Sequence, residues 1–445
     1  MKKYTMINRI LILGLFIFGL IPIGKAQKIY NLNDCISTGL EQNFSLQIVR
    51  NTENISKNNF TKGNAGFMPL VSLYNQVGGT LNNSVQNLSA GGQTTSSGIH
   101  NQSLYSSVSM SWTLFEGFNV QTTYKKLNEL GQLGTLNTQL SVEYLVADLI
   151  AAYYNFIQQV QIQINLKYAI KLSKERLRID EERYLLGSSS KLEVLQSRVY
   201  LNADSSRLSK HYETLRTAQV KLNELMGVEE IANEFSLQDS SILVNPDLQF
   251  EILSEHAMLK NTGLLISKKN QSLSTYDYQL VMSRTYPYLN LYSGYSFSRN
   301  FYETGTYTNS LTHGINYGIT FGVTIFDGFN QKRNLSNAVV DIKNKELKYQ
   351  EVEQGVKADL ITLYNAYSNH LRLIKLEEQN LQTASENLEI ALEKYKLGSL
   401  SGIELREVQK SLLDAKESLV SVQYQTKLAE VSLQLISGNI MSYFK

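Results

Sequence analysis

The sequence predicts a duplicated α+β membrane protein, in which a few alternating strands lead into very long helices. Segments of about 12 residues alternate between apolar and small polar side chains, as strands with two different faces do. Stretches of about 70 residues contain few helix breakers and repeat apolar residues at helical spacing. Because both patterns occur in each half of the chain, we expect each half to build the same unit.

The duplication is marked by the pattern Glu-x-Tyr-x-Leu-Gly-Ser-x-Ser-x-x-Glu, which occurs at Glu182–Glu193 and again at Glu393–Glu404, 211 positions later. The same offset relates two further pairs of landmarks, which are Phe115–Asn119 with Phe326–Asn330 and Gly227 with Gly438. Three landmarks therefore keep one register over more than a hundred residues. We expect a first repeat over 27–227, a connector over 228–249 and a second repeat over 250–445.

Residues 1–26 have the features of a secretory signal peptide. A basic start precedes the apolar run Ile10–Ile23, and small residues end at Ala26, after which we expect cleavage. The apolar run is shorter than the roughly 17 residues that a membrane-spanning helix needs. The alternative is a retained membrane anchor.

The composition excludes some classes of protein. The net charge of +2 and the pI of about 8.2 give no strong field for nucleic acid. The single Cys35 cannot form an intrachain disulfide, and we interpret it as a small buried residue on a helix. Only 4 prolines favour long regular elements, and 27 tyrosines indicate interfaces between water and an apolar phase.

Two very long helices are predicted, one between Gly117 and Gly187 and one between Gly328 and Gly398. At a rise of 1.5 Å per residue, about 70 residues span roughly 105 Å, which is more than a compact domain needs. A second helix follows each Gly-Ser turn, at Lys191–Met226 and Ile403–Ile436. The glycines Gly227 and Gly438 are expected to stop these helices.

Strict alternation over 103–115 and 314–326 predicts two strands that end just before the long helices. Their expected partners are Pro69–Thr80 and Pro287–Ser298, connected through polar loops at Leu81–Gln102 and Arg299–Leu311. Upstream of these, Asn33–Lys62 and Phe250–Met282 are expected to be helices, with Asn33 and Ser254 as N-caps.

The strands fit an outer membrane, where about 9–11 tilted residues suffice to cross. Their polar faces carry Gly, Ser, Thr and Asn rather than the Lys and Glu of a solvated sheet face. The alternative is the edge of a soluble sandwich. Four strands cannot close a membrane barrel, and unclosed edges in lipid leave backbone groups unpaired, so we expect several copies to associate.

Over essentially its whole mature length the chain resembles the TolC-like outer-membrane efflux protein family. The likeness rests on Leu32–Ser37 followed by Leu40–Asn43, on Phe-Glu/Asp-Gly-Phe at each strand-to-helix junction, and on Tyr-x-x-Gly-x-x-Ser-x-x-Glu at each helical turn. The resemblance implies a homotrimer. Four strands from each protomer would form a 12-stranded barrel in the outer membrane of a Gram-negative bacterium, and a helical tunnel would reach into the periplasm.

The same resemblance implies an exit duct of a tripartite efflux or type I secretion system, which passes small molecules or proteins and performs no catalysis. Its partners would be a periplasmic adaptor protein and, through it, an inner-membrane pump. The adaptor would dock at the exposed turns, whose residues in this chain are Gly187, Ser188, Ser190, Gly398, Ser399 and Ser401.

Family members form a constriction ring from acidic residues after the second turn, and the matching positions are Glu404 and Glu407. Three copies would place about six carboxylates around one aperture, which favours cations. The matching acid after the first turn is Glu193, which the family ties to a tyrosine at the position of Tyr395. Leu400 stands where an arginine can strengthen that tie, so the latch would be weaker or made by another base, for example Arg406, Lys394 or Lys396.

The alternative for Glu404 and Glu407 is a solvated helix face that is favourable to the helix dipole. The five histidines share no metal-ligand spacing, and no phosphate-binding Gly-Lys-Ser/Thr loop is present, so we expect no metal, no cofactor and no enzymatic activity. The rival from another class is an exported trimeric coiled-coil fibre or adhesin. A fibre or adhesin would account for the long helices but not for the four strands.

Overall fold

The computed structural model describes residues 28–304 and 307–444, so the expected signal peptide at 1–26 lies outside the described residues. The first half of the chain contains, in order, β1 (Lys28–Tyr30), α2 (Leu32–Gln42), α3 (Phe44–Asn59), β2 (Leu70–Asn87), β3 (Gln93–Glu116), α4 (Asn119–Leu185) and α5 (Lys191–Met226). The second half contains β4 (Phe235–Leu237), α6 (Phe250–Lys260), α7 (Thr262–Ser283), β5 (Tyr288–Phe301), β6 (Asn309–Gly322), α8 (Asn330–Lys396), α9 (Gly402–Ile436) and η1 (Ile440–Phe444).

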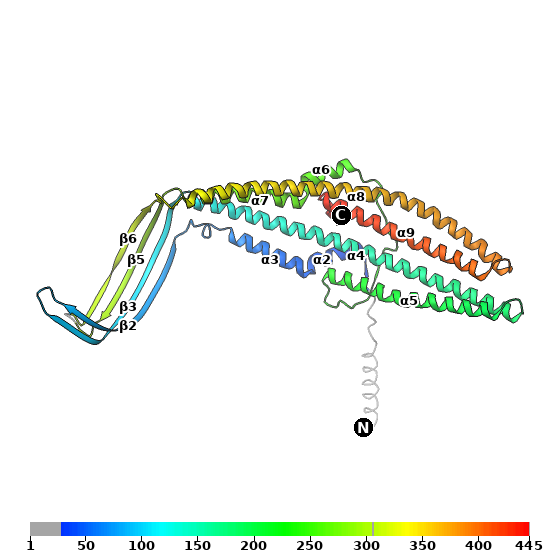
Figure 1. The fold of residues 1–445 in the computed structure, drawn as a ribbon, viewed down its shortest axis with the longest axis horizontal. Helices are drawn as coiled ribbons and strands as arrows, with labels where there is room; N and C mark the ends of the chain where they lie inside the picture. Colours follow the sequence, from blue (N-terminus) through cyan, green and yellow to red (C-terminus); the bar gives the residue numbers. More distant parts are fainter. Residues whose placement is uncertain (1–27, 305–306, 445) are drawn as a thin grey trace, which may run out of the picture.

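The protein is elongated, with the sheet at one end and the helical hairpins α4–α5 and α8–α9 at the other (Figure 1). Both long helices have 67 residues, which confirms the predicted lengths, and at 1.5 Å per residue each spans about 100 Å. Next to the sheet, α3 packs on α4, α4 on α7, and α7 on α8. Towards the far end the neighbours are α5 with α4, α4 with α9, and α9 with α8. Each protomer is thus a single curved layer of helices.

The four long strands form one antiparallel sheet in the order β2-β3-β5-β6, so β2 and β6 are its edges. The predicted loop Leu81–Gln102 is wrong, because β2 and β3 continue as a paired ribbon to Asn87 and Gln93. The second predicted loop, Arg299–Leu311, is shortened in the same way, because β5 continues to Phe301 and β6 begins at Asn309. Polar Asn, Ser and Thr side chains are compatible with a strand whose two faces are both solvated, and composition alone does not reveal this.

The upstream helices are each broken once, where one helix was expected. Asn43 and Asn261 lie at the breaks, and their side chains cap α3 and α7 by accepting from the backbone N–H of Leu46 and Leu264. The predicted N-caps are wrong: Asn31 caps α2 in a capping box with Asp34, and α6 begins after Gln249 rather than at Ser254. At each break the asparagine side chain caps the next helix, and the apolar periodicity of the sequence did not indicate this cap.

The middle of the layer holds the main apolar core, built on α4. Leu149, Ile150 and Tyr153 of α4 are fully buried against α2, α5 and the short parallel pair of β1 with β4. By length and composition alone, one stretch of α4 would suffice to cross a membrane, and half of that stretch is buried inside the protein.

Candidate functional site at the helical tips

The two helical turns form the end of the protein farthest from the sheet (Figure 1). Gly187 and Gly398 have φ of 75° and 80°, a left-handed conformation that glycine adopts without strain. The side chains of Ser190 and Ser401 then cap α5 and α9. All six residues predicted to dock a partner are exposed at these turns. Beside them lie Leu186 and Leu397, each 82% exposed, which sequence reasoning did not single out.

The two turns of one protomer lie beside each other. A Cβ at Gly398 would come within 2.6 Å of the Arg183 guanidinium, which belongs to the end of α4. The same guanidinium carbon lies 5.3 Å from the centre of the Tyr395 ring, as a cation–π contact. The tip is therefore a single surface composed of both repeats.

Glu404 is exposed and closes a capping box at the start of α9. Its carboxylate accepts from the Ser401 backbone N–H at 2.9 Å and from the Ser401 hydroxyl at 2.8 Å. These hydrogen bonds lower the pKa of the Glu404 carboxyl. Glu407 is exposed one turn later, and Glu193 accepts a hydrogen bond from the Ser189 hydroxyl. In a single protomer Glu404 therefore acts as a helix cap. This is close to the alternative given by the sequence, in which Glu404 lies on a solvated helix face that is favourable to the helix dipole.

We expect Ser401→Ala to loosen the first turn of α9 and to weaken the dependence of its protection on pH below 4.5, without abolishing it, because the backbone N–H at position 401 still donates to Glu404. The pKa of Glu404 lies below 4.5 in the folded protein, so its contribution is present above pH 4.5 and is lost as pH falls through the folded value. Hydrogen exchange, corrected for intrinsic rates, measures this at pH 7 and below pH 4. Ser399→Ala is the matched control, since that hydroxyl bonds only to the carbonyl of Lys394 at the end of α8. Equal protection in the two variants would contradict the capping role.

Tyr395 is 2% exposed, and its hydroxyl donates to Asp180 on α4. The predicted tie between Tyr395 and Glu193 is therefore wrong: Glu193 lies at the exposed turn, whereas the ring of Tyr395 is directed into the helical layer. Burial and the neighbouring Asp180 raise the pKa of the Tyr395 hydroxyl, so it remains a donor at neutral pH. Asp180 also accepts from the Ser197 hydroxyl on α5. One buried carboxylate thus holds α5 and α8 to α4.

Arg406 provides a second tie, between α9 and α5. Its guanidinium makes two hydrogen bonds of 2.8 Å to the two carboxylate oxygens of Asp204, a bidentate ion pair. Asp204 is 1% exposed and also accepts from the Ser173 hydroxyl of α4. The ion pair with Asp204 raises the pKa of Arg406. Arg406 was among the bases considered for a latch; Lys396 instead pairs with Glu393 on its own helix.

Arg176 lies between these two ties. Its Nε donates to the Ser197 hydroxyl at 2.9 Å and is 3.8 Å from Asp180. The ring of Tyr200 makes cation–π contacts with two guanidinium groups, whose central carbons lie 4.6 Å (Arg176) and 5.1 Å (Arg406) from the ring centre. Burial lowers the pKa of Arg176. We call this group of buried and half-buried residues the coil clasp; it consists of Ser173, Arg176, Asp180, Ser197, Tyr200, Asp204, Tyr395 and Arg406.

Most residues of the coil clasp were not identified from the sequence, although the spacing of three of them could have indicated it. Ser173, Arg176 and Asp180 are spaced by three and four residues, which places them on one face of α4 together with buried Leu172 and Ile179. Charged residues within an apolar stripe indicate buried partners. Buried ion pairs of this kind are weak evidence for added stability, but removing one partner is strongly destabilising.

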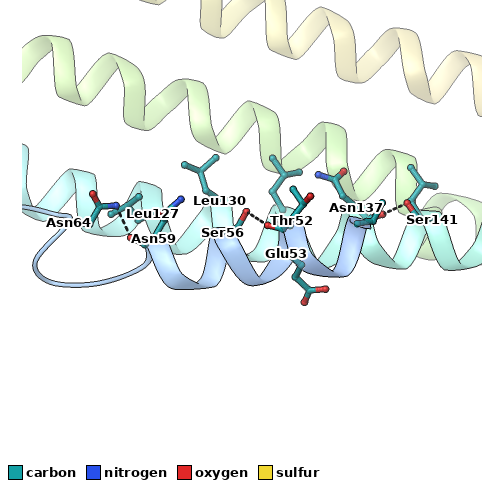
Figure 2. Close-up of a pocket in the computed structure, with 13 residues that line it drawn as sticks. Thr52, Glu53, Ser56, Asn59, Asn64, Leu127, Leu130, Asn137 and Ser141 are labelled. Carbon is teal, nitrogen blue, oxygen red and sulfur yellow. Dashed lines mark hydrogen bonds between the residues drawn. The ribbon is translucent and has the colours of Figure 1, made fainter. Parts of the chain in front are cut away.

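A groove of about 660 Å³ lies between α3 and α4, nearer the sheet (Figure 2). Short side chains such as Thr52, Ser56 and Gly134 leave this space open. Its only acidic residue, Glu53, points away from the groove in Figure 2, pairs with Lys57 at 2.6 Å and accepts from Thr135. Among the described residues no group of three or more potential metal ligands gathers here or elsewhere. Polar side chains of the groove bond to nearby backbone carbonyls, as Ser56 does to Thr52 and Asn64 to Asn59.

A sheet with one apolar face, continued by helices of about 100 Å that end in exposed turns, defines the class of outer-membrane proteins with a long periplasmic extension. Residues 253–439 match the sequence profile described as "Outer membrane efflux protein". This match covers less than half of the chain, so over its second repeat the chain is similar to this family, whose proteins are Gram-negative outer-membrane channels with a periplasmic part. The family match covers the second repeat, and the internal duplication extends the same architecture to the first.

Individual relatives are distant. The cation efflux system protein CusC of Escherichia coli K12 is 23% identical over 323 residues, which span 69% of this chain and 66% of that protein. Two crystal structures share the fold over 92% of this chain: CusC, with a TM-score of 0.73 and 16% identity, and the Campylobacter jejuni CmeC outer membrane channel, with a TM-score of 0.74 and 16% identity. These cover 92% and 86% of the two solved chains.

Proposed function

We propose that this protein is the exit duct of an export system, in which three copies close a 12-stranded barrel and a continuous helical tunnel. The observation that carries the proposal is the four-stranded sheet whose edges β2 and β6 are both unpaired. Each backbone group left unpaired in lipid costs several kcal/mol, so the sheet requires neighbours on both sides. Each half of the sheet leads directly into a helix of 67 residues, so closing the barrel also closes a tunnel.

The proposed partners are a periplasmic adaptor at the tips and an inner-membrane pump behind it. A duct has no energy source of its own, and the pump would supply it. The name of the E. coli relative, a cation efflux system protein, favours efflux of small solutes over secretion of proteins. We propose no catalytic role for any residue of this chain.

The channel is distinguished from an exported fibre or adhesin by single-channel recording. Purified protein in planar bilayers is expected to give discrete conductance steps, and a fibre would give none. The extended β2–β3 ribbon and the apolar outer face of β6, which includes Ile315, Tyr317 and Ile319, support the duct because a fibre has no use for them. Absence of conductance from correctly assembled trimers would exclude the duct.

We propose that Glu404 and Glu407 line the narrow end of the tunnel. Replacing both by glutamine is expected to reduce the preference for cations severalfold, because about six carboxylates would leave one aperture. Reversal potentials in asymmetric KCl measure the preference. Glu193→Gln is the matched control, since Glu193 is bonded to Ser189 at the other turn. An unchanged reversal potential in the double variant would remove Glu404 and Glu407 from the constriction.

We propose that the adaptor docks on the two exposed turns. Tryptophan at both Gly187 and Gly398 is expected to abolish export, because a large side chain in a left-handed turn both strains the backbone and blocks the surface. The variant should still reach the membrane as a trimer. Drug accumulation in cells and semi-denaturing gels measure the two outcomes. Retained export with both substitutions would place the docking surface elsewhere.

A further inference from the structure

The polar face of the sheet carries tyrosine rings at matching places in the two repeats. We propose that Tyr74 and Tyr292 form an aromatic belt on the inner wall of the barrel, on which uncharged, planar aromatic solutes stack as they leave. The inference rests on the proposed duct, because only a closed barrel turns this face into the wall of a bore. The belt gives the duct a binding station for one chemical class of solute.

The register of the strands fixes which side chains share this face. Directly paired residues lie on one face of a sheet, and the faces alternate along each strand. Tyr292 pairs with Gly318 on β6 and with Ser111 on β3. Tyr74 pairs with Ser107, which lies on the same face of β3 as Ser111. The large aliphatic side chains of the strands occupy the other face, which meets lipid in the proposed barrel, so both tyrosines face the bore.

The two tyrosines occupy equivalent positions of the duplicated chain. The prolines that precede the two strands, at 69 and 287, are 218 positions apart. Tyr74 and Tyr292 are separated by the same 218 positions, so each lies at the same distance from the start of its strand. In a closed barrel built from both repeats, every copy would therefore contribute two rings at one level of the bore.

Tyr292 lies across the neighbouring strand. A Cβ at Gly318 would come within 2.4 Å of the Tyr292 hydroxyl oxygen and within 2.5 Å of the ring carbon that bears it. Because glycine leaves this space free, the ring rests on the wall instead of projecting across the bore. Tyr292 is nevertheless 44% exposed, so much of the ring remains open. Four residues nearer the helices, Tyr288 covers Gly322 in the same way, with 2.5 Å between its hydroxyl oxygen and a Cβ there.

Tyr74 is oriented by other contacts and is equally open. Its hydroxyl donates to Oε1 of Gln76 at 3.0 Å, and its ring centre lies 6.1 Å from that of Tyr105. The side chain is 52% exposed. Aromatic cover of a glycine stabilises a strand by itself, but Tyr74 pairs with Ser107, so strand stabilisation does not account for both members of the belt. Rings that are positioned in advance lose little conformational entropy when a solute binds.

The face around the belt has almost no charge. Its side chains are mostly Ser, Thr, Asn, Gln and Gly, and of those that the structure describes on the four strands Glu116 alone carries a charge. Glu116 pairs with Tyr288 at the end of the sheet next to the helices, and its carboxylate accepts from the Asn119 side chain at 3.1 Å. Arg299 lies on the lipid-facing side, since it pairs with Leu104. A charged solute therefore finds no counter-charge at the belt.

An uncharged, planar aromatic solute matches these groups. Aromatic rings attract one another in offset or edge-to-face arrangements, beyond the effect of the area that they bury. The hydroxyl and amide groups beside the rings can exchange hydrogen bonds with polar substituents. The rings also form successive steps, since Tyr288 lies about 13 Å along the strand from Tyr292 on the side of the helices. On the far side, Tyr105 pairs with Gln76, two residues beyond Tyr74.

The belt is tested by the KCl current through single channels in planar bilayers. Coumarin, which is uncharged and planar, is expected to interrupt the current, and camphor, which is uncharged and of similar size but not planar, should interrupt it far less. Tyr74→Leu with Tyr292→Leu is expected to raise the half-blocking concentration of coumarin roughly two- to tenfold, because the aromatic contact is lost while an apolar side chain remains. Tyr74→Phe with Tyr292→Phe should preserve the block, because the rings remain.

Tyr317→Leu is the matched control, since Tyr317 lies on the lipid-facing side of β6 and is 80% exposed. It should leave the block unchanged, and a loss of block there equal to that of the double leucine variant would overturn the belt. A double leucine variant that is blocked as strongly as the wild type would overturn it too. If that variant does not assemble, the wild type still decides, because equal block by coumarin and camphor excludes a stacking site.

The charge of the solute is tested with coumarin-3-carboxylate, the anionic analogue. Stronger block by the anion than by coumarin would overturn the assignment to uncharged solutes. Wild-type channels that conduct but are not blocked by coumarin would overturn the belt and leave the duct intact. Absence of conductance from assembled protein would overturn the duct, and the belt with it.

Discussion

Asp204→Ala is expected to loosen the helical tip by breaking the coil clasp. Arg406 would lose both of its 2.8 Å hydrogen bonds, and Ser173 would lose its acceptor. Removing one partner of a buried ion pair costs about 3–5 kcal/mol, since the remaining charge is left without compensation. The cost falls on contacts that join α9 to α5, so the packing of the two hairpins at the tip should loosen. If the tip lies at the narrow end of the proposed tunnel, basal conductance and uptake of large antibiotics should both rise.

The control is Glu181→Ala, which removes a 3.0 Å ion pair to Arg198 between α4 and α5, with both side chains about half exposed. Exposed pairs contribute roughly 0–1 kcal/mol, so neither conductance nor thermal stability should change noticeably. A second variant, Asp204→Leu with Arg406→Leu, separates charge from packing. Apolar replacement of both partners should recover most of the stability. Wild-type conductance and stability in Asp204→Ala would show that the clasp does not hold the helices of the tip together.

Gly117→Ala is expected to prevent assembly of the barrel. Gly117 and Phe118 are both left-handed, with φ of 56° and 68°, and together they turn β3 into α4. Alanine would add about 1–2 kcal/mol of backbone strain and would place its Cβ 2.2 Å from the backbone of Ser283, which cannot move without shifting the end of α7. Heat-resistant trimers on gels and the yield in outer membranes measure the result.

Gly328→Ala is the informative comparison. Gly328 has the same left-handed conformation, so the backbone strain is the same, but within one protomer the added Cβ would not clash with another residue. A tolerated Gly328→Ala beside a failed Gly117→Ala would assign the failure to the clash with Ser283, and equal failure of both would assign it to backbone strain. Normal assembly of Gly117→Ala would mean that the junction between strand and helix relaxes more easily than its geometry indicates.

Periodicity along the chain was enough to predict the long elements. Both helices of 67 residues and the strand stems that precede them follow from local alternation and spacing. The glycines at 187, 227, 398 and 438 end helices as expected, because their role depends only on local backbone conformation. Errors occurred where a local pattern was weak: the polar hairpins were expected to be loops, and the breaks at Asn43 and Asn261 were missed.

The candidate site was predicted less well. Glu404 and Tyr395 were selected, but the partners of Tyr395 and Arg406 were not, because these pairs lie 215 and 202 positions apart in the chain. A charged residue can be recognised in an apolar stripe, as at Arg176 and Asp180, but the stripe does not say which helix covers it. Only packing of the four helices brings the clasp together.

The sequence by itself determined that the protein is a duplicated chain with strands that continue into long helices, since repeats and periodicity are properties of the order of residues. The tertiary structure decided the order of strands in the sheet, the two unpaired edges and the partners of each buried charge. Those features depend on which surfaces meet in space. Contacts between distant segments arise from burial and hydrogen-bond pairing of whole elements, and no short stretch of sequence encodes them alone.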